Sequence, residues 1–113
     1  MDVTRVSAAC RSLPSATEGY PFGGGALVFK VGGRIFAILG ETNVSLKCDP
    51  VLATVLREQY PAVTAGYHLN KRHWNTIELD GSVEDDVLSE WIEDSYQLAL
   101  TSLTRAQRTA LDR

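Results

Sequence analysis

Long apolar runs, closely spaced cysteines and a large net charge are all missing from this sequence. No uncharged, largely apolar run approaches the roughly 20 residues that a membrane-spanning helix needs, so we expect no membrane segment. The N-terminal residues 1–5 lack a basic region followed by an apolar run, which is the pattern of a secretory signal. These absences predict a cytoplasmic protein that does not bind a membrane.

Only two cysteines are present, Cys10 and Cys48, and their spacing matches no metal or redox motif. Two buried free thiols are the expected state in the cytoplasm, with a disulfide as the alternative. The two histidines, His68 and His73, would need a third and usually a fourth ligand to hold zinc. No motif supports a pair of Cys48 with a histidine for nucleophilic catalysis. We therefore expect no metal and no cofactor.

The net charge of the chain is also small. Its 113 residues suffice for one domain, which we expect to span residues 1–113 and to be monomeric. The net charge is −3, but residues 1–83 hold 8 Lys and Arg against 7 Asp and Glu, whereas residues 84–113 hold 3 against 7. The acidic surplus therefore lies in the C-terminal segment. It opposes long-range attraction of nucleic acid but leaves room for a local basic surface.

Apolar periodicity and turn residues predict the element order α-βββ-α-ββ-α. The predicted helices cover about 3–13, 49–60 and 82–100, with a short final helix over 104–111. The predicted strands cover 26–31, 34–39, 44–48, 67–69 and 74–80, and residues 15–25 and 62–66 are predicted to be connections. This order predicts an α+β fold. It is a two-layer sandwich in which a five-stranded antiparallel sheet carries helices on one side.

Local signals define several of these boundaries. Pro14 ends the first helix, and Asp49 followed by Pro50 is typical of a helix start. The segment Ser82–Asp85 has the pattern of a capping box, and Gly32 with Gly33 is the length of a tight hairpin turn.

Two helices carry wide apolar stripes that predict their packed faces. The stripe of the second helix comprises Leu52, Val55, Leu56 and Tyr60. The stripe of the long helix comprises Leu88, Trp91, Ile92, Ser95 and Leu98 or Ala99.

Residues 66–81 combine both histidines, Trp74 and a Lys-Arg pair with a strand. Since Ile77 and Leu79 must face the core, alternation places Trp74 on the more exposed strand face, near the turn at 70–73. An exposed tryptophan is typical of a binding surface, and coverage by residues 61–66 is the alternative. Lysine, arginine and asparagine side chains there can contact phosphate, and an aromatic ring can stack or wedge between bases.

The chain resembles the MmcQ/YjbR family over nearly its whole length. The residues that carry the resemblance are Leu13-Pro14, Glu18 with Pro21-Phe22-Gly23, residues 28–37, Ser45-Leu46-Lys47-Cys48, residues 67–75 and Ser95-Tyr96. The pattern of Tyr-His, Asn-Lys and His-Trp-Asn within residues 67–75 is the most specific part. Arg34 stands where the family usually has lysine after the glycine turn, which keeps the charge.

This resemblance implies a fold similar to CyaY-like and secretion-chaperone-like sandwiches, and DNA binding through a double-wing motif. The wing residues carried over are Lys30, Arg34, Lys47, Asn70, Lys71, Arg72, His73, Trp74 and Asn75. The alternative is a protein-interaction module that uses a patch around Trp74. An enzyme has the least support and would need a pocket that joins Glu18, Tyr67 and His68 with His73, so we expect no enzymatic activity.

Overall fold

The computed structural model describes residues 1–66 and 69–111. Its elements are α1 (Val3–Arg11), β1 (Ala16–Gly19), β2 (Leu27–Val31), β3 (Arg34–Leu39), β4 (Asn43–Lys47), α2 (Pro50–Gln59), β5 (Val63–Ala65), β6 (Trp74–Glu78), α3 (Asp85–Thr101) and α4 (Arg105–Leu111). The strands form one antiparallel sheet in the order β1-β2-β3-β4-β6-β5. The α+β fold with an open antiparallel sheet is confirmed, but the sheet has six strands, not the predicted five.

Both additional strands lie in segments predicted to be connections. β1 pairs with β2 from Ala16 to Gly19, and β5 pairs with β6 from Val63 to Ala65. They are the two edge strands, and of their seven residues only Val63 is fully buried. Strands this short and exposed show no alternation of apolar and polar residues from which a strand could be predicted. Of the strand predicted over 67–69, residues 67 and 68 lie outside the described part, and Leu69 is not in a strand.

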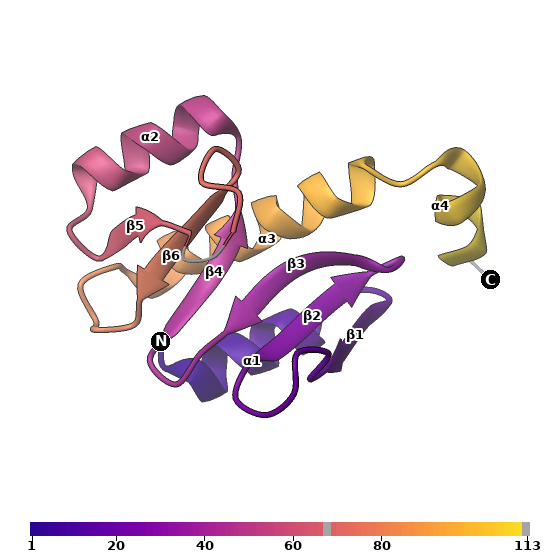
Figure 1. Cartoon of the computed structure of the whole chain (residues 1–113), viewed down its shortest axis with the longest axis horizontal. Coiled ribbons are helices and arrows are strands. Elements are labelled where there is room, and N and C mark those ends of the chain that lie inside the picture. The colour runs from indigo at the N-terminus through magenta and orange to yellow at the C-terminus, as the bar shows by residue number, and fades with distance from the viewer. Residues whose placement is uncertain (67–68, 112–113) are drawn as a thin grey trace.

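The first three helices cover one face of the sheet, and the core lies between the two layers (Figure 1). Within the core, Phe36 contacts Phe29 and meets Tyr96 of α3 edge-on at 5.4 Å between ring centroids. A β-bulge makes this possible. Phe29 pairs with Ala37 but Lys30 pairs with Ile35, so Phe36 is the extra residue on β3. Both Phe36 and Ala37 therefore reach the helix-covered face.

Strands β3 and β4 part beyond the pair Ala37–Leu46. Ser95 of α3 fills the opening: its Oγ donates to the Phe36 carbonyl oxygen at 2.6 Å and accepts from the Lys47 amide at 2.8 Å. This fully buried serine thus replaces the ladder bonds that the splayed strands cannot make.

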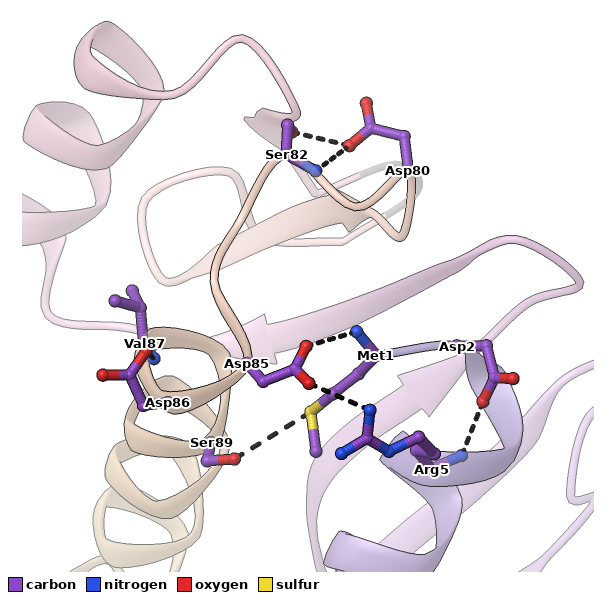
Figure 2. A network of polar contacts seen from close by, with 9 residues as sticks. All are labelled: Met1, Asp2, Arg5, Asp80, Ser82, Asp85, Asp86, Val87 and Ser89. Atoms are coloured by element: carbon purple, nitrogen blue, oxygen red, sulfur yellow. Dashed lines mark hydrogen bonds and ion pairs between the residues drawn. The ribbon is translucent and has the colours of Figure 1, made fainter.

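The predicted start of α2 is confirmed, but that of α3 is wrong. Asp49 accepts from the Val51 and Leu52 amides, and Pro50 is the first helical residue. No capping box forms at Ser82. Its amide and hydroxyl bond Asp80 instead, so the helix begins only at Asp85 (Figure 2). No helix among residues 1–66 and 69–111 is long and apolar enough to span a membrane.

The apolar stripe of α2 is only partly buried, contrary to the prediction, whereas that of α3 is buried in its Ala99 alternative and leaves Leu98 outside. Leu56, Leu88 and Ile92 belong to the core, whereas Leu52 is 41% exposed and Leu98 37% exposed. Leu52 and Leu98 are exposed because they line an open groove between the two helices.

Candidate nucleic-acid interface

The predicted turn at 70–73 is confirmed and presents its charged side chains to solvent. The Asn70 carbonyl accepts from the His73 amide at 3.2 Å and from the Trp74 amide at 3.0 Å. The Asn70 side-chain oxygen accepts from the Arg72 amide at 3.0 Å. The Asn70 carboxamide is thereby used in part to shape the turn. Lys71 and Arg72 are both exposed.

The turn is tied to α2 by one arginine. Arg57 Nε donates to Asn75 Oδ1 at 2.8 Å, and its guanidinium also bonds the Lys71 carbonyl oxygen. Asn75 Nδ2 donates to the Ala53 carbonyl oxygen at 3.2 Å, and Asn75 is 2% exposed. The expectation that Asn75 contacts DNA is therefore corrected. It lies on the helix-covered face beside Leu46, where it joins the strand to α2.

Lys47 and Trp74 lie opposite each other on the face that no helix covers. They are register partners in the β4–β6 pair, and alternation places them on the other face from Leu46 and Asn75. The Cys48 amide donates to the His73 carbonyl oxygen at 2.7 Å, which brings the turn against the end of β4. Trp74 is half-buried, and a Cβ on Gly66 would lie 2.8 Å from Trp74 Cβ.

The other predicted wing is the β2–β3 turn, which carries Arg34 and adjoins Lys30. Both turns lie at the same end of the strands, because β2 ends and β3 begins where β4 ends and β6 begins. The splay between β3 and β4 separates them, and in Figure 1 the β2–β3 turn lies beside α4 while the other lies beside α2. The structure thus places Lys71 and Arg72 beside α2, with Lys47 at the adjoining strand end, and sets Lys30 and Arg34 apart.

Charge is segregated along the strand direction. The acidic side chains at the opposite end, which holds the β3–β4 turn and the start of α3, are Asp2, Glu41, Glu78, Asp80, Glu84, Asp85 and Asp86. There Asp85 accepts from the terminal ammonium at 2.6 Å and from Arg5 at 2.9 Å (Figure 2). The bond from the ammonium is the main cause that lowers the pKa of Asp85. The acidic side chains thus dominate this end, whereas the end with Lys47, Lys71 and Arg72 also holds Asp49 and Asp94.

The alternative pocket around Glu18 falls in part outside the described residues, because Tyr67 and His68 are not described. Glu18 itself lies on β1, where Arg11 bonds it at 2.5 Å and lowers its pKa. His73 precedes β6, and three strands separate β6 from β1. Within the described part of the chain, Glu18 and His73 do not share a site.

Both cysteines are free thiols held in the protonated form. Burial raises the pKa of Cys10 to about 12. Burial also raises the pKa of Cys48, and the carboxylates of Asp49 and Asp94 add to this effect. Neither environment activates a nucleophile. No group of three or more His, Cys, Asp or Glu side chains suited to a metal occurs among residues 1–66 and 69–111.

A groove of about 330 Å³ between α2 and α3 is a second candidate site, which the sequence did not predict. Leu52 and Leu98 border it. The signal was present in the two wide apolar stripes, but a stripe does not show whether its helix meets a neighbour.

Comparison with known proteins places the chain in a family. The family model described as YjbR matches residues 11–98. The Escherichia coli protein YjbR is 35% identical over 98% of both chains. Another E. coli protein, YbdF, is 33% identical over 82% of this chain and 80% of its own. The crystal structure of Deinococcus radiodurans protein DR2400 is 38% identical and superposes with a TM-score of 0.91, over 98% of this chain and 88% of that one.

A Pseudomonas syringae structure shares the fold at a TM-score of 0.76 with 24% identity, over 88% of this chain and 99% of its own.

Proposed function

The chain belongs to the YjbR family, and we propose that it is a small DNA-binding protein that contacts phosphate through the turn at Lys71 and Arg72. The observation that carries the proposal is the placement of these two cations. They are exposed on a turn that Arg57 fastens to α2, and Lys47 lies at the adjoining strand end. Cations that the fold holds in place on an exposed turn attract a polyanion such as DNA.

Two further features support this function. Trp74 lies across from Lys47 on the helix-free face, and its partly exposed side chain offers a stacking surface for an unpaired base. Arg34 and Lys30 then form the second wing, set apart by the strand splay. We favour single-stranded DNA as the ligand, because stacking needs bases that are free of a duplex.

The remaining properties belong to the same proposal. Residues 1–113 act as one domain and as a cytoplasmic monomer without enzymatic activity. The fold is of the CyaY-like, secretion-chaperone-like kind, with which a single antiparallel sheet covered by helices on one face agrees.

The test is a fluorescence-anisotropy titration of labelled single-stranded DNA at about 50 and 200 mM salt. Affinity should fall steeply with salt. Lys71→Ala with Arg72→Ala should weaken binding and lower the salt slope by roughly 0.7 for each lost phosphate contact.

The matched control is Arg105→Ala with Arg108→Ala on α4, which removes two exposed positive charges away from the turn. Since α4 lies beside the β2–β3 turn of the second wing, this control should lower the slope by less than the Lys71 and Arg72 variant does. An absence of binding at low salt, or an equal loss in both double variants, would contradict the proposal.

Protein binding through a Trp74 patch is the alternative function. Trp74→Ala in the same titration distinguishes the two. A stacking role requires weaker DNA binding, whereas a pure protein patch leaves DNA affinity unchanged.

A further inference from the structure

The groove between α2 and α3 lies on the helix-covered face, and Asn75 in its lining is bonded to Arg57, which also bonds the turn at Lys71. Leu46 and Ile77 of the sheet form its floor, and Leu52 and Leu98 lie on its two helical walls. Tyr60 at the end of α2 meets Trp91 of α3 edge-on at 5.1 Å between ring centroids, and this contact bridges the two helices at one point. The groove therefore lies along two helices that meet at the Tyr60–Trp91 contact.

The apolar surface continues beyond the hollow onto the helices that border it. Leu98 on α3 is 37% exposed, and on α2 Leu52 is 41% and Val55 is 37% exposed. Single exposed apolar side chains are ordinary, but Leu52 and Leu98 both line one groove, and Val55 lies about one turn along α2 from Leu52. A small molecule that filled about 330 Å³ would leave these rims in water. The occupant must therefore extend over both helices.

The charges at the rim are acidic. Of the described lining residues, Asp49, Asp94 and Lys47 carry charge, and alternation directs the Lys47 side chain to the opposite face of the sheet. Asp49 and Asp94 are exposed, and both carboxylates act on the thiol of Cys48 in the groove wall. The rim therefore favours a cationic partner and disfavours nucleic acid.

We propose that this groove binds a short basic amphipathic helix of a partner protein, with apolar side chains in the groove and Lys or Arg beside Asp49 and Asp94. Trp91 and Leu98 are seven residues apart on α3, which is two helical turns or about 10 Å. Anchors at i, i+3 or i+4 and i+7 match this span. A second copy of the chain fits less well, because a twofold dimer would place Asp49 and Asp94 of both copies together.

The test uses a fluorescein-labelled Leu/Lys peptide of about 14 residues with apolar positions at helical spacing. Two comparison peptides accompany it: a Leu/Glu analogue, and a Leu/Lys peptide of equal composition with alternating spacing. Anisotropy should show saturable binding of the helical Leu/Lys peptide, and about tenfold weaker binding of both others. The double variant Leu52→Lys with Leu98→Lys should weaken binding of the helical Leu/Lys peptide by about tenfold or more.

The matched control is Tyr20→Lys with Phe22→Lys, which adds the same charge at two exposed apolar residues between β1 and β2. It should bind as the wild type does. Asp94→Asn keeps the size of the side chain. It should weaken binding of the helical Leu/Lys peptide but not of the Leu/Glu peptide. This variant tests the proposal even if the double lysine variant fails to fold.

Four outcomes would overturn the proposal. Equal losses of peptide affinity in both double variants would mean that only the overall charge of the protein attracts the peptide. Equal affinity for the Leu/Glu peptide would mean that the acidic rim has no role in binding. A concentration-dependent dimer that the groove variant abolishes in sedimentation assigns the groove to a second copy. Amide shifts at Leu52 and Leu98 on addition of single-stranded DNA alone would assign the groove to nucleic acid.

Discussion

At the scale of single residues, several side chains that mark the family have structural tasks. Ser95 bridges β3 and β4, and the Tyr96 hydroxyl donates to the Pro14 carbonyl oxygen at 2.7 Å. Asn75 joins β6 to α2. The resemblance therefore identifies the fold through these residues, while the exposed Lys71 and Arg72 carry the proposed binding.

Replacing Ser95 with alanine should cost about 1–3 kcal/mol of unfolding free energy, because the Phe36 carbonyl and the Lys47 amide lose their partner in a buried place. Urea unfolding followed by circular dichroism measures this. Ser89→Ala on the exposed side of the same helix should cost less than about 0.5 kcal/mol. Similar losses at both positions would refute the bridging role.

At the scale of elements, the segment between α3 and α4 packs closely on the β2–β3 turn. Gly32 has a φ of +57°, and a Cβ there would lie 2.6 Å from Leu103 Cδ1. Gly33 has a φ of +82°, but a Cβ there would meet open space. Leu103, two residues before α4, thus packs on the β2–β3 turn where Gly32 leaves room for it.

Gly32→Ala and Gly33→Ala form a matched pair, since both place alanine at positive φ. We expect Gly32→Ala to be the more destabilising by about 1 kcal/mol, because only it displaces the buried Leu103. Thermal unfolding of the two variants measures the difference. Equal stabilities would mean that Leu103 moves aside without cost.

The sequence predicts those elements whose signals are local. The Asp49-Pro50 start of α2 and the strands around Phe29 and Val44 were predicted, because caps and apolar alternation are written in neighbouring residues. β1 and β5 were missed, because strands of three or four residues at a sheet edge bury too little to show a period. A capping box was expected at Ser82, whereas the pair that bonds reciprocally is Thr104 with Gln107.

The candidate site was predictable only in part for the same reason. Composition identifies Lys71 and Arg72 as exposed cations. It does not show that Arg57, far back in the chain, holds Asn75 inside the fold. Nor does it show that α2 and α3 leave Leu52 and Leu98 uncovered. Such facts depend on tertiary distances, which one sequence does not contain.

At the scale of the whole molecule, the antiparallel sheet separates charges that are mixed along the chain. Sequence order places Asp80 close to Arg72, but β6 carries them to opposite ends. The same fold gives two surfaces of opposite preference: a basic turn at one strand end, and an apolar groove with acidic rims under α2 and α3.

An NMR titration of ¹⁵N-labelled protein with single-stranded DNA of about ten nucleotides at low salt tests the central claim most directly. If the turn binds DNA, we expect the largest amide shifts at Lys47, Lys71 and Arg72. Smaller shifts are expected at Arg34, and none at Glu41 or at Leu98 in the groove. Shifts concentrated in the groove or at the acidic end, or no shifts at all, would contradict it.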